Sequence, residues 1–184
     1  MPTKLYPVLS RVEIKRKKIQ EKEEITMAEF DYIKEFRNDH VWVVDNLLKL
    51  KGAVAGGSLG EAREIVDALD KGVGPHFLFE EEALYPALRT FLGEYIDELL
   101  GEHDGALTVV NGLKDLLSRD TLSNEQRKTV DKYISAFFVH ASNCDGLALL
   151  AQRLSDEQQK EMARKFQEAR ATGKPLTVWA RGKA

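Results

Sequence analysis

The sequence contains few of the residues that mark several common classes of protein. A single cysteine, Cys144, in 184 residues excludes an internal disulfide framework and any CxxC metal site. No apolar run approaches the ~18 residues that a transmembrane helix needs, and no apolar stretch typical of a signal peptide follows the first lysine. At a net charge of −3, nothing draws the whole molecule to nucleic acid or to an anionic membrane. We therefore expect a soluble, cytoplasmic protein that binds neither nucleic acid nor membranes.

Strand patterns and internal repeats are also missing, whereas helix signals are frequent. No segment alternates strictly between apolar and polar residues, and no low-complexity tract is present. Four capping boxes each precede a segment with apolar residues at three- and four-residue spacing. The boxes are Thr26 with Glu29, Ser58 with Glu61, Ser123 with Gln126, and Ser155 with Gln158.

The apolar spacing predicts four long helices, at about 27–51, 59–89, 94–118 and 124–154, and a shorter one at 156–171. A kink or restart is expected in the second helix at Gly72, Gly74 and Pro75, because proline cannot donate a hydrogen bond to the preceding turn. We predict an all-α, up-down-up-down four-helix bundle over residues 26–155. Residues 1–25 would form an N-terminal extension, and residues 156–184 a C-terminal helix followed by a docked or loose tail.

The chain has four histidines, His40, His76, His103 and His140, and each falls on the apolar stripe of a different long helix. Taken singly, each is typical of a hydrogen-bonded core residue. Packing four helices around one axis would bring these imidazoles together and deprive them of hydration. A bound metal would supply what they lack, and imidazole is a good ligand for iron, zinc and copper.

Two carboxylates have suitable spacing for such a site. Glu80 follows His76 by four residues and shares its face of the helix, whereas Asp145 follows His140 by five, which is a looser fit. Four imidazoles and two bridging carboxylates would serve two metal ions, and this mixture of nitrogen and oxygen suits iron. The alternatives are a solvated acidic face at 80–82 and, for Asp145, a polar residue at a helix irregularity.

At these residues the sequence resembles the hemerythrin-like, HHE cation-binding family. The similarity covers about 30–154 and is carried by NDH at 38–40, HFLFEE at 76–81, LYP at 84–86, EHD at 102–104 and the HxxxxD spacing at 140–145. It implies a non-haem di-iron centre in a four-helix bundle. His40 and His76 would bind one iron, His103 and His140 the other, and Glu80 and Asp145 would bridge them.

One departure from the family pattern concerns the second iron. Oxygen-carrying hemerythrins have two histidines at HxxxH spacing on the third helix, whereas leucines stand four residues before and after His103. The missing ligand would be replaced by water, by Glu81 or Glu102, or by nothing. Cys144 follows His140 by four residues, and we favour a buried thiol there over a thiolate ligand.

The resemblance implies binding or sensing of O2 or NO, or iron storage, donation or repair. An open metal position facing Phe77, Phe79, Leu107 or Phe137 would admit a diatomic molecule. The alternative is a di-iron oxidase or an enzyme that reduces peroxide or NO, although the chain lacks the Glu-x-x-His motifs of ferritin-like oxidases at its histidines. A metal-free helical interaction protein would leave the aligned histidines unexplained. The sequence identifies no catalytic residue and leaves the protein partner unknown.

Overall fold

The computed structural model describes residues 30–180, which form helices and no strand. The long helices are α2 (Tyr32–Gly56), α3 (Leu59–Phe79), α5 (Tyr95–Leu117) and α6 (Asn124–Asp145). The shorter elements are the π-helical turn η1 (Glu80–Leu84), α4 (Tyr85–Leu92), α7 (Leu147–Ala151), α8 (Asp156–Thr172) and α9 (Leu176–Trp179). The chain divides into the units Met1–Asp31 and Tyr32–Ala184. The predicted boundary after residue 25 lies outside the described residues, so it stays a prediction.

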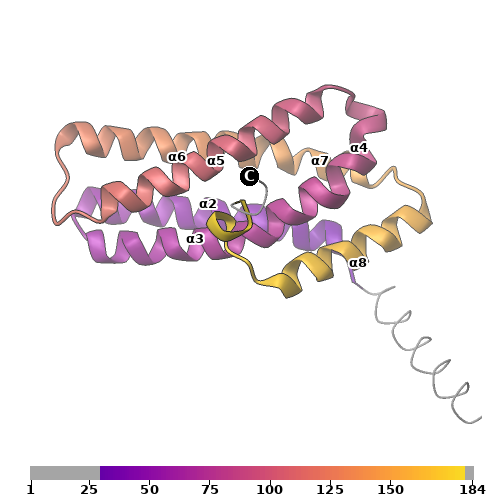
Figure 1. The fold of residues 1–184 in the computed structure, drawn as a ribbon, viewed down its shortest axis with the longest axis horizontal. Helices are drawn as coiled ribbons and strands as arrows, with labels where there is room; N and C mark the ends of the chain where they lie inside the picture. Colours follow the sequence, from indigo (N-terminus) through magenta and orange to yellow (C-terminus); the bar gives the residue numbers. More distant parts are fainter. Residues whose placement is uncertain (1–29, 181–184) are drawn as a thin grey trace, which may run out of the picture. The chain divides into compact units, whose positions relative to one another are not determined.

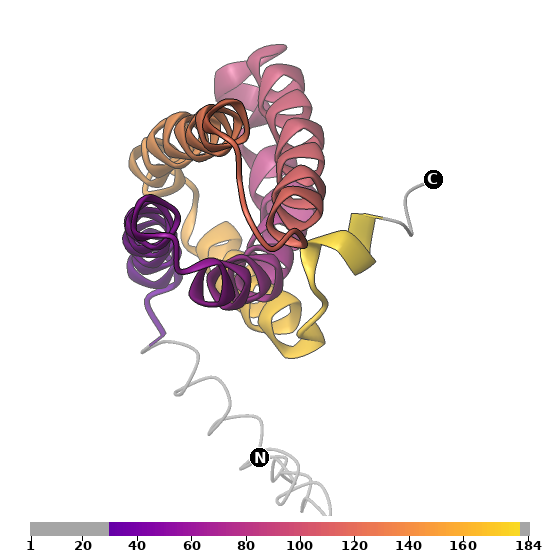
Figure 2. The ribbon, with the colours of Figure 1, turned by 90° about the vertical axis from the view of Figure 1, so that its left-hand side faces the viewer.

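The four long helices enclose the core of the second unit. Helix α2 packs against α3 and α6, and α5 packs against the same two helices, so the four surround a common interior (Figure 1). Figure 2 looks along these helices, and α8 and α9 lie outside that interior against α3. Leu47, Leu69 and Val110 are among the fully buried side chains of this core. The predicted all-helical class is confirmed, and the arrangement is consistent with a hemerythrin-like helical bundle.

The start of each helix tests the predicted capping boxes. The boxes of Ser123 and Ser155 are confirmed, because each hydroxyl accepts from the backbone N–H three residues on and the glutamine side chain accepts from the serine N–H in return. Ser58 precedes α3 without a side-chain cap hydrogen bond. That prediction is wrong because the backbone of Ser58, at φ −81° and ψ 66°, does not have the extended conformation of the two working caps. Thr26 and Glu29 lie outside the described residues.

Helix α3 is continuous through its glycines and its proline, so of the kink or restart predicted at Gly72, Gly74 and Pro75 the restart is wrong, and the kink stays a prediction. The irregularity lies further on, at η1, where the helix widens for one turn. Gly74 has a packing role instead. A Cβ at this position would lie 2.1 Å from the carbonyl oxygen of Lys174, so glycine lets the C-terminal segment approach the backbone of α3.

The described part of the C-terminal tail is docked. Buried Asp70 of α3 accepts hydrogen bonds from the backbone N–H and the hydroxyl of Thr177, at 2.9 and 2.8 Å. The same carboxylate accepts from Lys114 Nζ of α5, at 2.8 Å. Leu176 is buried against the core, and Trp179 packs at its edge. The described part of the tail therefore packs on α3 and α5 and belongs to the same unit.

Helices α6 and α7 also carry a feature that the sequence analysis did not anticipate. The segment Asn124–Ala151 is long and apolar enough to cross a bilayer by length and composition alone, because it contains an 18-residue window with a mean hydropathy of 1.3. Of that apolar window, 44 % is buried inside the protein. The buried positions of these helices include Phe137 and His140. Packing into the core thus accounts for the apolar character of the buried 44 % of this window.

Candidate metal centre

Two groups of potential metal ligands lie inside the bundle and share one carboxylate. The first consists of His40, His76 and Glu80, and the second of Glu80, His103, His140 and Cys144. Within each group the ligand atoms lie within 4.8 Å of one another. The side chains come from α2, from α3 and the start of η1, from α5 and from α6. The structure thus brings together five of the predicted ligands and adds the cysteine.

Glu80 is the residue that joins the two groups. Its side chain is 0 % exposed, with Oε1 lying 3.5 Å from His76 Nε2 and Oε2 lying 3.0 Å from His103 Nε2. Neither contact has hydrogen-bond geometry, so both oxygens lack a donor among the described residues. Burial would raise the pKa of this carboxyl, but the neighbouring imidazoles lower it well below its usual range. A buried, ionised carboxylate without donors fits a cation on each side.

Each histidine has a carboxylate near the Nδ1 atom of its ring, on the side away from the two ligand groups. The inner Nε2 atom of every ring faces the groups described above, and Nδ1 faces an acidic side chain. The partners are Asp39 for His76 (3.2 Å), Glu81 for His103 (2.9 Å) and Glu102 for His140 (2.9 Å), whereas Asp145 lies 3.5 Å from His40 Nδ1 without a hydrogen bond. Such partners orient metal-binding histidines, keep the proton on the outer nitrogen and raise the basicity of the inner one. Glu81 and Glu102, weighed above as ligands, lie in these supporting positions.

The protonation of the imidazoles differs within each group. Burial and the charge of His76 lower the pKa of His40 to about 4. For His76 itself, burial opposes the positive charge, but Glu80 and Asp39 outweigh it and raise the pKa to about 9. Burial likewise lowers the pKa of His140, whereas the carboxylates around His103 raise its pKa despite burial. At neutral pH the first group thus holds a neutral His40 and a protonated His76, and a metal must displace the His76 proton to bind.

Asp145, predicted as a bridge, lies outside both groups. Its carboxylate is 36 % exposed and pairs with Arg37, whose two guanidinium nitrogens lie 3.2 Å from its oxygens, as well as facing His40 Nδ1. The reason is helical phase. Five residues turn a regular α-helix by about 140° from His140, whereas four residues turn it by only about 40°. Because α6 stays α-helical to Asp145, the side chain that points inward is Cys144.

Tyr85 is a residue of the centre that sequence reasoning missed. Its hydroxyl lies 2.9 Å from His103 Nε2 and 3.5 Å from Cys144 Sγ, and the side chain is buried. Cys144 Sγ in turn lies 3.6 Å from His140 Nε2. Burial raises the pKa of this thiol well above its ordinary value, which agrees with the predicted buried thiol. A phenol and a thiol therefore lie beside the two imidazoles of the second group.

The part of the chain that carries both ligand groups matches a known protein family. A family described as the hemerythrin HHE cation binding domain matches residues 31–149, which contain every residue of both groups. The chain belongs to this family. No curated protein and no solved structure matches the chain. In the HHE family the shared function is cation binding, and the two groups around Glu80 are the residues here that can perform it.

The HHE centre is lined by aromatic rings. Phe77 stacks on His103 with the ring centroids 3.7 Å apart and the ring planes at 6°. Phe36 stacks on His76 at 4.9 Å and was not anticipated. Phe79, which was expected to face the site, lies against Phe36 and Phe166 instead. These rings keep water away from two of the four imidazoles.

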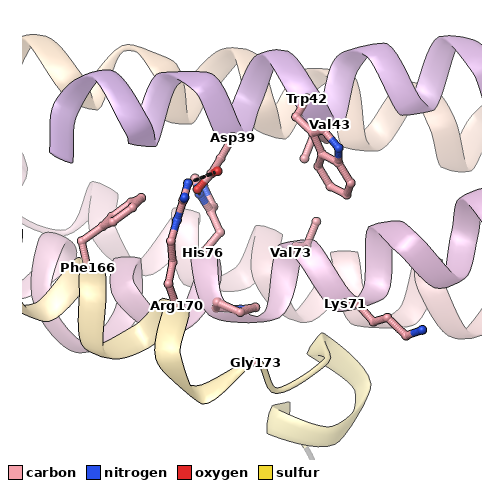
Figure 3. Close-up of a pocket in the computed structure, with 11 residues that line it drawn as sticks. Asp39, Trp42, Val43, Lys71, Val73, His76, Phe166, Arg170 and Gly173 are labelled. Carbon is pink, nitrogen blue, oxygen red and sulfur yellow. Dashed lines mark hydrogen bonds and ion pairs between the residues drawn. The ribbon is translucent and has the colours of Figure 1, made fainter. Parts of the chain in front are cut away.

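Within residues 30–180, cavities border His76, His103 and His140 of this HHE protein. One of about 410 Å³ lies beside His76, where Arg170 of α8 reaches Asp39 across the opening (Figure 3). A second, of about 230 Å³, lies beside His103 and is lined by Leu107 and Trp179, among others. The third, of about 340 Å³, lies beside His140 between α5 and α6. Its lining is mostly apolar or small and includes Gly105, Ala106, Val109, Ala136 and Phe137.

Proposed function

We propose that this HHE protein holds two iron ions, one in each group, with Glu80 as the bridge, and that it binds or senses a small diatomic molecule such as O2 or NO. The observation that carries the proposal is the shared carboxylate. Glu80 lies between two pairs of imidazoles, and both of its oxygens are buried without a hydrogen-bond donor.

We also propose the up-down-up-down order of the long helices, which their short connections support.

The donor set favours iron over the other metals that imidazole binds. Nitrogen and carboxylate oxygen predominate, and the described residues offer one thiol rather than the thiolate pairs of a structural zinc site. Two ions bridged by one carboxylate would supply an exchangeable position at which a diatomic molecule binds. The carboxylates at the Nδ1 atoms would hold the four rings in the ligating orientation throughout.

The surroundings favour a small, uncharged ligand. Phe36 and Phe77 cover imidazole faces, which limits water and protons at the centre. The apolar cavity next to His140 leads to the second group and offers no charged side chain other than Glu102. Bulk iron storage is less well supported, because within residues 30–180 no third cluster of histidine, cysteine or acidic ligands accompanies the two groups.

The test is metal analysis of the full chain, purified without a histidine tag from cells grown with ample iron. We expect about two irons per chain, one for each group, and absorption in the near ultraviolet typical of bridged ferric ions. Addition of NO to the anaerobic ferrous protein should change its spectrum with a stoichiometry of one NO per centre or less. Stoichiometric zinc in place of iron would contradict the proposal. Catalytic consumption of NO or peroxide, well beyond that stoichiometry, would favour the enzymatic alternative.

A further inference from the structure

The two ligand groups are not equivalent, and the difference lies in Tyr85. The first group has two imidazoles and Glu80, with the Phe36 ring stacked on one imidazole. The second group has two imidazoles, Glu80, the Cys144 thiol and, in addition, the Tyr85 hydroxyl.

A local change of helix type brings Tyr85 to the second group. In a regular α-helix, Tyr85 would lie about 140° around the axis from Glu80 and would point away from the centre. Instead, the N–H of Tyr85 donates to the carbonyl of Glu80 five residues back, which closes the π-helical turn η1. Both side chains consequently reach the same atom, His103 Nε2, at 2.9 Å for Tyr85 Oη and 3.0 Å for Glu80 Oε2. Such single π-helical turns are rare in proteins, and those that occur often lie at functional sites.

Resting on the proposed di-iron function, we infer that Tyr85 is a ligand of the second iron, together with His103, His140 and Glu80. Binding breaks the phenol O–H bond, leaves the electron pair on the oxygen for the metal, and releases the proton to solvent. The phenolate adds one negative charge beside a cation that otherwise shares a single carboxylate with its neighbour. Phenolate oxygen is a hard ligand suited to ferric iron, whereas a thiolate suits softer metals.

Cys144 then packs beside the iron ligands without binding the iron itself. Its sulfur lies within 4 Å of the Tyr85 hydroxyl and the His140 ring, at 3.5 and 3.6 Å, so it packs between two ligands. The two candidate ligands can be told apart, because a tyrosinate and a thiolate each give ferric iron a visible charge-transfer band of their own. Resonance Raman excitation within a tyrosinate band enhances phenolate ring vibrations.

The experiment compares the ferric full-length protein with three variants, Tyr85→Phe, Tyr133→Phe and Cys144→Ala, by iron analysis, visible absorption and resonance Raman. Tyr133 is the matched control, because its ring is half-buried on α6 against Gly112 and is not part of either group. We expect a phenolate band in the wild type, in Tyr133→Phe and in Cys144→Ala. Tyr85→Phe should lose that band while retaining at least half of its iron.

Other outcomes overturn the inference in distinguishable ways. Iron-loaded wild type without a phenolate band, or Tyr85→Phe with the band intact, removes Tyr85 as a ligand and leaves the di-iron proposal standing. A visible band that disappears only in Cys144→Ala assigns the ligand to the thiolate instead. A wild type that takes up no iron ends both proposals. If Tyr85→Phe does not fold, ring-deuterated tyrosine in the wild type decides the question, because the enhanced vibrations must then shift.

Discussion

Replacing Glu80 with glutamine keeps the shape of the side chain and removes the charge that the two ligand groups share. Glu80 is 0 % exposed and lies at 3.5 and 3.0 Å from one imidazole of each group. Its loss should therefore weaken the binding of at least one iron. Partners that merely support a metal ligand cost ~10–100-fold in affinity when removed, so loss of a direct bridge should cost at least tenfold.

That affinity converts into a measurable shift in melting temperature. With free metal at 100 times the dissociation constant, binding stabilises the wild type by about 2.7 kcal/mol. A tenfold weaker variant in the same solution gains about 1.4 kcal/mol, so the gain falls by ~1.3 kcal/mol. For a chain of this length, 1 kcal/mol moves the melting temperature by about 2–4 °C. The rise on adding Fe(II) should thus be about 3–5 °C smaller in Glu80→Gln than in the wild type.

Each protein is melted anaerobically with and without Fe(II), so that its own metal-free form serves as the reference, and iron content is measured in parallel. Glu82→Gln is the control, because Glu82 lies in the same π-helical turn but its side chain is exposed. It should match the wild type in iron content and differ by less than ~0.5 kcal/mol in stability. Equal iron loading and an equal rise in melting temperature in both variants would refute the bridging role of Glu80.

Three further predictions follow from the same contacts. Asp145→Ala should keep two irons at saturation and lose about tenfold in affinity, as expected for a residue that supports His40; loss of one iron would restore Asp145 as a bridge. Asp70→Ala should lower the free energy of unfolding in urea by ~2–4 kcal/mol, because it removes the buried acceptor of three hydrogen bonds, two from Thr177 of the tail and one from Lys114 of α5. Asp67→Ala, at an exposed carboxylate beside the same lysine, should cost under ~1 kcal/mol, and equal losses would contradict this difference. Gly74→Ala should release the C-terminal segment, seen as faster hydrogen exchange there, whereas Gly101→Ala, with open space at its Cβ, should stabilise α5 by ~0.5–1 kcal/mol.

The helical class and the positions of the histidines could be predicted because both depend on short-range pattern. Apolar residues at three- and four-residue spacing place each imidazole on the inner stripe of its helix. Four such stripes that meet in one core must bring the rings together. The two capping boxes at Ser123 and Ser155 were legible for the same reason, since all their partners lie within three residues.

The supporting carboxylates were beyond the reach of this pattern. Asp39, Glu81 and Glu102 look like surface acids in the sequence, and each meets an imidazole from a different helix. Such contacts depend on how the helices are rotated and offset against one another. Packing of the whole core sets that rotation, and spacing within one helix does not reveal it.

The sequence by itself determined that four histidines and one carboxylate would meet inside a helical bundle. The tertiary structure alone decided which neighbours complete the centre. Regular α-helix to the end of α6 turns Asp145 away and Cys144 inward, whereas one π-turn at η1 brings Tyr85 inward. The physical reason is that a single residue gained or lost in one turn rotates every later side chain by about 100°. Periodicity assumes a constant turn, so it places residues correctly up to the first irregularity and not beyond it.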